Sequence, residues 1–179
     1  MMQASLAPRA TLDACVLANY WVSNLLLRLA KSPCLPQPSW SEPILAEVRR
    51  THRKLGWPDT IAETWQSAVR GAFPEAMHPI DHRLLGELGV DPDDRHVLAC
   101  AITAESDIIV TFNLRDFPDR GLAPWNIRAI HPDDFLVELH RLHLSAVGAT
   151  FAQIAARYPR GEALRRLARH LPKVAALLR

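Results

Sequence analysis

Apolar side chains recur along this chain at two spacings, one typical of strands and one typical of helices. Short apolar or β-branched runs at residues 9–14, 107–111 and 127–130 are typical of buried strands. Elsewhere apolar residues return every three or four positions, which is the spacing of an amphipathic helix. We therefore predict helices over residues 15–30, 41–55, 60–72, 82–88, 91–105 and 131–142, and then a helical tail interrupted at 158–161.

The order of these elements predicts the fold class. Strands that alternate with helices indicate an α/β fold with a parallel sheet and helices on both of its faces. Residues 33–38 contain three prolines and are predicted to form a connector. The helical tail is predicted to be a C-terminal appendage.

The net charge of +2 conceals an uneven distribution. Residues 140–179 contain eight Lys and Arg side chains and one acid, Glu162, a balance of +7, which leaves −5 for residues 1–139. An acidic body with a basic tail indicates an anionic or nucleic-acid partner. The overall composition, 49% hydrophobic and 22% charged, excludes a disordered or fibrous chain.

The cysteines and the apolar segments predict a soluble cytoplasmic protein. Cys15, Cys34 and Cys100 are an odd number without metal-ligand spacing, which favours buried thiols in a reducing compartment. Residues 1–12 contain no apolar segment typical of a signal peptide, and no apolar run has the length of a membrane span. We therefore expect neither secretion nor a membrane partner.

Four acidic residues occupy positions where a carboxylate is costly or lies close to a sheet edge. Asp13 ends the first strand, and Asp116 follows a later strand by a few residues. Both therefore belong to the carboxyl edge, where open α/β sheets bind ligands. Asp94 heads the apolar stripe of its helix, and Glu47 lies on the core-facing flank of an earlier one. Brought together, four carboxylates repel one another unless a cation compensates them.

A hard divalent cation is the natural partner of such a set. Mg²⁺ or Mn²⁺ binds oxygen ligands, often one or two carboxylates plus a substrate phosphate, and activates water for in-line attack on phosphorus. The pattern thus indicates phosphodiester hydrolysis. Each acid also has a simpler interpretation: Asp13 as a helix N-cap, Asp94 as an acid in a first helical turn, Glu47 as a surface ion-pair partner and Asp116 as an ordinary loop residue.

The four acids lie in segments that resemble, in order, the four motifs of PIN-domain nucleases. The segments are Thr11–Leu17, Trp40–Val48, Asp91–Ala101 and Ile109–Pro118, and the resemblance covers about residues 9–135. It implies a PIN-like nuclease domain over residues 1–135 and a helical C-terminal extension over residues 136–179.

The resemblance also implies roles for individual residues. The catalytic acids would be Asp13, Glu47, Asp94 and Asp116, with Asp13, Asp94 and Asp116 as ligands of Mg²⁺ (or Mn²⁺) and with Thr111 and Asn113 lining the pocket. Two positions depart from the family pattern. Many relatives carry Asp at the position of Asn113, and an Asn side chain still offers a carbonyl oxygen. Cys15 stands where the family often has a polar Asn or Thr, so we expect looser hydrogen bonding around Asp13 without loss of metal binding.

Within this family, this small chain most resembles the toxin ribonucleases of VapBC toxin–antitoxin pairs. That resemblance implies a metal-dependent endoribonuclease, an RNA substrate, a cognate antitoxin protein and a homodimer. The basic residues predicted to hold RNA phosphates beside the acids are Arg49, Arg50, Arg53 and Arg115.

Two alternatives stay open: a PIN-fold module that binds RNA or a partner without cleavage, and a housekeeping RNA-processing nuclease with the same site. Two further side chains that could take part in catalysis are predicted to have no catalytic role. His96 is predicted to lie on the surface, and Cys100 is predicted to be an inert buried thiol.

Overall fold

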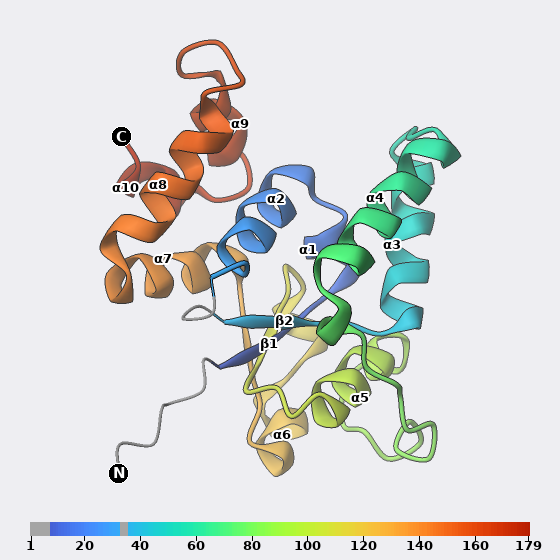
Figure 1. Cartoon of the computed structure of the whole chain (residues 1–179). Helices are drawn as coiled ribbons and strands as arrows, with labels where there is room; N and C mark the ends of the chain where they lie inside the picture. Colours follow the sequence, from blue (N-terminus) through green and yellow to red (C-terminus); the bar gives the residue numbers. More distant parts are fainter. Residues whose placement is uncertain (1–7, 33–35) are drawn as a thin grey trace.

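Four parallel strands form the centre of the computed structural model, which describes residues 8–32 and 36–179 (Figure 1). The strands are β1 (Arg9–Leu12), β2 (Gln37–Ser39), β3 (Ile108–Val110) and β4 (Arg128–Ile130). Their order across the sheet is β2-β1-β3-β4, and Leu12 at the end of β1 pairs with Val110 at the end of β3. The parallel sheet confirms the predicted α/β class.

Helices cover both faces of this sheet, as predicted. In Figure 1, α2 and the C-terminal helices lie on one side of the strands, and α5 and α6 lie on the other. The α-helices of the described residues are α1 (Ala14–Leu17), α2 (Tyr20–Leu29), α3 (Glu42–Lys54), α4 (Asp59–Ala72), α5 (Arg95–Thr103), α6 (Asp119–Leu122), α7 (Pro132–Leu142), α8 (Leu144–Ala155), α9 (Glu162–Ala168) and α10 (Pro172–Leu177). Short 3-10 turns are η1 (Pro74–Ala76), η2 (Pro92–Asp94), η3 (Leu114–Asp116) and η4 (Ala123–Trp125). No helix of the described residues is long and apolar enough to cross a membrane.

The ends of α3 show how local sequence sets an element. Pro43 lies in its first turn, where a missing N–H costs nothing. At the other end Gly56 adopts a left-handed conformation, φ +81°, which glycine tolerates at a helix terminus. Apolar residues at helical spacing, including Ile44 and Val48, are fully buried on one face.

Three sequence predictions need correction. The helix predicted over residues 15–30 is broken, because Asn19 is extended and its side chain accepts the N–H of Val22 to start α2. The connector predicted over 33–38 contains the start of β2, an edge strand in which Pro38 is tolerated because its missing N–H is not needed for pairing with β1. Residues 82–88 form successive turns instead of a helix.

The C-terminal helices pack against α2 and share its core. Val147 and Phe151 of α8 belong to the same buried cluster as Leu25 of α2. The Tyr20 and Tyr158 hydroxyls lie 3.0 Å apart at the edge of this contact. Because α7 runs across residues 135 and 136 without a break, the boundary between a nuclease domain (1–135) and an extension (136–179) stays a prediction.

A close backbone contact holds the segment that precedes Asp91 against α6. A Cβ atom added at Gly121 would lie 2.3 Å from the carbonyl oxygen of Gly89, so this contact requires glycine. The segment then continues into η2, and the Asp91 N–H donates to the Asp116 carbonyl at 3.1 Å. Two of the acid-bearing segments are thereby joined by their backbones.

Candidate active site

Asp13 lies at the carboxyl end of β1 and is held there by β3. Its backbone N–H donates to the Val110 carbonyl at 3.1 Å, which continues the pairing of the two strands by one residue. The Asp13 side chain is almost fully buried, and the Thr111 hydroxyl donates to its Oδ2 at 2.6 Å. The Asn113 N–H donates to the same hydroxyl at 2.9 Å, so the Thr111 proton is directed toward Asp13.

Cys15 supplies a second donor to the same carboxylate oxygen. Its thiol lies 3.1 Å from Asp13 Oδ2, while Sγ accepts the Phe112 N–H at 3.5 Å. Burial, followed by the negative charge of Asp13, raises the pKa of this thiol to about 12, so it stays protonated and able to donate. The loosening expected at this position is not seen, because the thiol bridges the end of β3 and Asp13.

Asp94 is the acid on which the electrostatics of the site converge. It stands at the end of η2 and precedes α5 without forming a side-chain cap. Burial, together with the charges of Asp13, Asp116 and Glu47, raises its pKa to about 6. The structure therefore brings the other three predicted acids within electrostatic reach of Asp94.

Glu47 is paired with a histidine of α5. Its Oε2 atom lies 3.3 Å from Nε2 of His96, whose Nδ1 lies 2.9 Å from the Asp93 carbonyl. The hydrogen bond to His96 lowers the pKa of Glu47, and nearby Arg50 and Lys54 act in the same direction. His96 is thus a site residue, and the prediction that it is a plain surface side chain is wrong. Its position two residues after Asp94, on the side of α5 that faces α3, was the available signal.

The donor set fits a hard divalent cation in charge and in chemistry. Burial raises the pKa of Asp94, and the negative charges of Asp13, Asp116 and Glu47 raise it further. In residues 8–32 and 36–179, no group of three or more His, Cys, Asp or Glu side chains is arranged to hold a metal ion by itself. Mg²⁺ commonly needs only one or two protein carboxylates, because water and substrate phosphate complete its shell.

The other predicted pocket and RNA-contact residues differ in their surroundings. Asn113 is exposed beside Thr111, and Arg115 is exposed next to Asp116. Arg50 is exposed near Glu47. By contrast, the guanidinium groups of α3 that point toward α4 are already paired: Arg49 with Glu63, and Arg53 with Asp59 at 2.6 Å.

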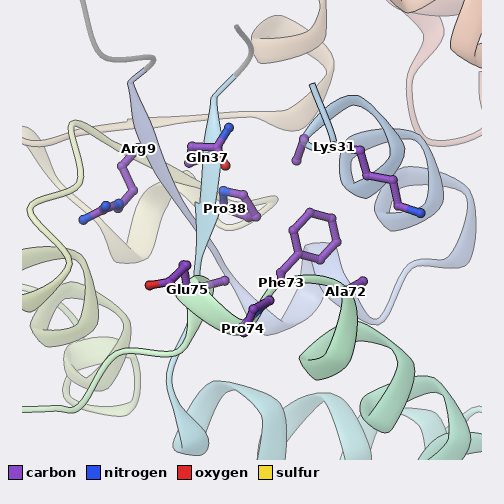
Figure 2. A pocket seen from close by; sticks show the side chains of 10 residues that line it. Arg9, Lys31, Gln37, Pro38, Ala72, Phe73, Pro74 and Glu75 are labelled. Carbon is purple, nitrogen blue, oxygen red and sulfur yellow. The ribbon is translucent and has the colours of Figure 1, made fainter. Parts of the chain in front are cut away.

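A cavity of about 410 Å³ lies at the opposite ends of the same strands (Figure 2). Arg9 and Gln37, which begin β1 and β2, line it together with Phe73 and Glu75 from the segment after α4. Lys31 lies across from Phe73. Because β1 separates this cavity from Asp13, it is distinct from the acidic site.

Comparison with known proteins relates the chain to a family. The family model described as "PIN domain" matches residues 9–115, which include Asp13, Glu47 and Asp94. Over 100 residues the chain is 37% identical to "Putative ribonuclease VapC50" of Mycobacterium tuberculosis, an alignment that covers 54% of this chain and 59% of that protein. A comparison with solved structures finds no match. Since the family model covers more than half of the chain, the protein belongs to the PIN-domain family.

Proposed function

We propose that this protein is a metal-dependent endoribonuclease and acts as the toxin of a toxin–antitoxin pair. The observation that carries the proposal is the site around Asp94, where burial and the charges of neighbouring acids, Asp13, Asp116 and Glu47 among them, raise its pKa at the carboxyl edge of a PIN-domain sheet. The similarity to a protein named as a VapC ribonuclease supports RNA as the substrate. A housekeeping role would use the same site.

In this proposal Asp13, Asp94 and Asp116 would hold Mg²⁺ or Mn²⁺. When bound, such an ion activates water for in-line attack on a backbone phosphate and offsets charge on the leaving oxygen, which gives 5′-phosphate and 3′-hydroxyl ends. Thr111 and Cys15 both donate to Asp13 Oδ2 and so fix the orientation of its carboxylate, which leaves Oδ1 available. Glu47 is held by His96 and by the charges of α3.

The partners follow from the same proposal. A toxin needs a cognate antitoxin, which would cover the acidic site until it is released, and we expect a homodimer in the cytoplasm. The predicted contacts of Arg50 and Arg115 with RNA fit their exposure beside the acids. Arg49 and Arg53 would first have to leave their carboxylate partners on α4.

The test is cleavage of total cellular RNA by the purified, antitoxin-free protein in EDTA, Mg²⁺ or Mn²⁺, with new 5′ ends mapped by sequencing. We expect metal-dependent cuts at one or a few sites, lost in Asp94→Asn and kept in Asp119→Asn, which removes an exposed acid of α6. Cleavage by Asp94→Asn at the parent rate would contradict the site. Absence of RNA cleavage by the metal-loaded parent protein would favour the alternative of a non-cleaving RNA- or partner-binding module.

A further inference from the structure

Exposed arginines gather on the C-terminal helices around the turn between α8 and α9. Arg157 and Arg160 lie in this turn, Arg165 lies on α9, and Arg169 ends it. All four are exposed, and none forms an ion pair with another residue in the described parts of the chain. The one acid of residues 140–179, Glu162, is already paired with Arg166 at 2.5 Å.

These cations differ from those of the α3–α4 hairpin. There, Arg53 pairs with Asp59 and Arg70 with Glu42, so the positive charges help to hold two helices together. On α9, Arg165 and Arg169 stand one helical turn apart with like charge, an arrangement that weakens a helix slightly. An anionic partner would remove this repulsion.

Aromatic rings lie beside the arginines. Tyr20, the first residue of α2, is 42% exposed, and its hydroxyl lies 3.0 Å from that of Tyr158 in the α8–α9 turn. Trp21 packs against Tyr158 with ring centroids 4.9 Å apart, and the Arg166 guanidinium lies 5.8 Å from the Trp21 ring. The exposed Tyr20 ring and the unpaired guanidinium groups of the neighbouring turn match what unpaired nucleotides offer, because bases stack on rings while phosphates bind cations.

The aromatic rings also connect the arginines to the acidic site. Tyr20 follows Asp13 by seven residues, through the single short helix α1. Figure 1 shows α8 and α9 beside α2, which leads back through α1 to the end of β1. A nucleic-acid strand that leaves the acids along α1 would therefore meet Tyr20 and then the arginines.

We propose that Tyr20, Arg157, Arg160, Arg165 and Arg169 form a binding surface for single-stranded RNA, here named the arginine–tyrosine surface. The proposal rests on the proposed function, since it assigns to this surface the segment of substrate RNA that lies outside the acidic site. The carboxylates repel phosphates, and residues 1–139 carry a balance of −5, so cations outside this part of the chain would add to the affinity for RNA that Arg50 and Arg115 provide. Guanidinium groups suit this task because they bind phosphate oxygens in pairs.

The test measures RNA binding without cleavage. A fluorescein-labelled oligouridylate is titrated in EDTA with the full-length protein over a series of salt concentrations, and its anisotropy gives the affinity. The variant Arg160→Gln/Arg165→Gln/Arg169→Gln is compared with Lys31→Gln/Arg83→Gln/Arg120→Gln, which removes three exposed charges elsewhere. Circular dichroism and melting curves verify that both variants are folded.

We expect the first variant to bind at least about tenfold more weakly. The slope of log affinity against log salt should fall by about 0.7 for each RNA phosphate that the variant no longer neutralises. The second variant should keep the slope of the parent. Tyr20→Leu should bind about fivefold more weakly, because a stacking ring is removed, whereas Tyr20→Phe should bind as the parent does.

Equal loss in both triple variants would overturn the proposal, because net charge alone would then explain the binding. Unchanged RNA binding by the first variant would overturn it as well, and would leave the arginines to a protein partner. Cleavage in Mn²⁺ is measured separately. A parent that binds through this surface but never cleaves contradicts only the nuclease, and a first variant that binds and cleaves as the parent does contradicts only the surface.

Discussion

The chain contains the tripeptide Pro-Asp-Asp twice, at residues 92–94 and 132–134, and each copy lies at the start of a helix. In the second copy Asp133 is buried and accepts the backbone N–H groups of Lys173 and Val174, both at 2.9 Å, at the start of α10. In the first copy Asp94 forms no cap and faces other acids.

The two carboxylates, one partly and one fully buried, differ in the groups that surround them. Burial of a charge is costly unless donors or opposite charges compensate it. Asp133 receives two N–H donors from a helix 40 residues further along the chain, so its charge holds the C-terminal helices in place. Asp94 instead lies near other negatively charged side chains, so a bound cation would compensate its charge. The same tripeptide therefore stabilises the packing of the C-terminal helices in one region and, as we propose, supplies a metal ligand in the other.

The largest expected effect comes from neutralising the second Asp of the first tripeptide, with the second Asp of the other tripeptide as its control. Asp94→Asn should lower RNA cleavage by at least about a hundredfold, because a carboxylate that would hold the metal is removed. Asp134→Asn, at the equivalent position, removes only a surface ion pair with Lys173 and should cleave within about twofold of the parent. Rate constants on one mapped RNA site measure both, and equal losses in the two variants would break the comparison.

Stability should show the reverse pattern at the first Asp. Asp133→Ala should lower the free energy of unfolding by about 2–3 kcal/mol, because one buried and one partly buried N–H donor lose a charged acceptor. Asp93→Ala, an exposed position in the other tripeptide, should change it by less than about 0.5 kcal/mol. Urea denaturation followed by circular dichroism gives both values. A stable Asp133→Ala protein would show that the α10 contact is dispensable.

The pH dependence of the metal-free protein should reveal the uncompensated charge. The pKa of Asp94 is raised from 3.8 to about 6, so between these values the folded state binds more protons than the unfolded state. Its contribution to stability therefore falls as the pH rises from about 4 to about 6, by about 1 kcal/mol after allowance for solvent screening. Melting curves in EDTA over this range should show a shallower decline in Asp94→Asn than in the parent. Parallel curves would count against the electrostatic coupling of the four acids.

The smallest effect concerns the donors around Asp13. Cys15→Ala removes one of the two side-chain donors to Asp13 Oδ2 and should weaken Mn²⁺ binding by about fivefold, the equivalent of one modest hydrogen bond. Cys15→Ser retains a donor and should bind Mn²⁺ nearly as the parent does. Isothermal titration of the RNA-free protein measures both affinities. If Ala and Ser behave alike, the thiol does not position Asp13.

Local patterns predicted much of the fold, and pairing across the chain decided the rest. The β3 segment and α3 have strong apolar patterns and clear end signals, and they lie where the sequence predicts them. The strand β2 was missed because Gln37, Pro38 and Ser39 carry no strand pattern, and only pairing with β1 makes them one. Residues 82–88 have a helical pattern but form turns.

The candidate site shows the same limit. Asp13 was predictable because strand ends define the sheet edge. The pairing of His96 with Glu47 depends on how α5 meets α3, which neither segment encodes alone. The two tripeptides are the clearest case, because Asp133 differs from its counterpart through the start of α10, about 40 residues away.

The contact between Gly89 and Gly121 sets a limit on how this protein can vary over evolution. A side chain at position 121 would displace the backbone that leads into Asp91, and the Asp91 N–H in turn holds the Asp116 carbonyl. Any replacement of Gly121 should therefore be accompanied in the same lineage by a change in the length or path of residues 86–91. In directed evolution of the chain, position 121 should stay glycine because of this backbone contact alone.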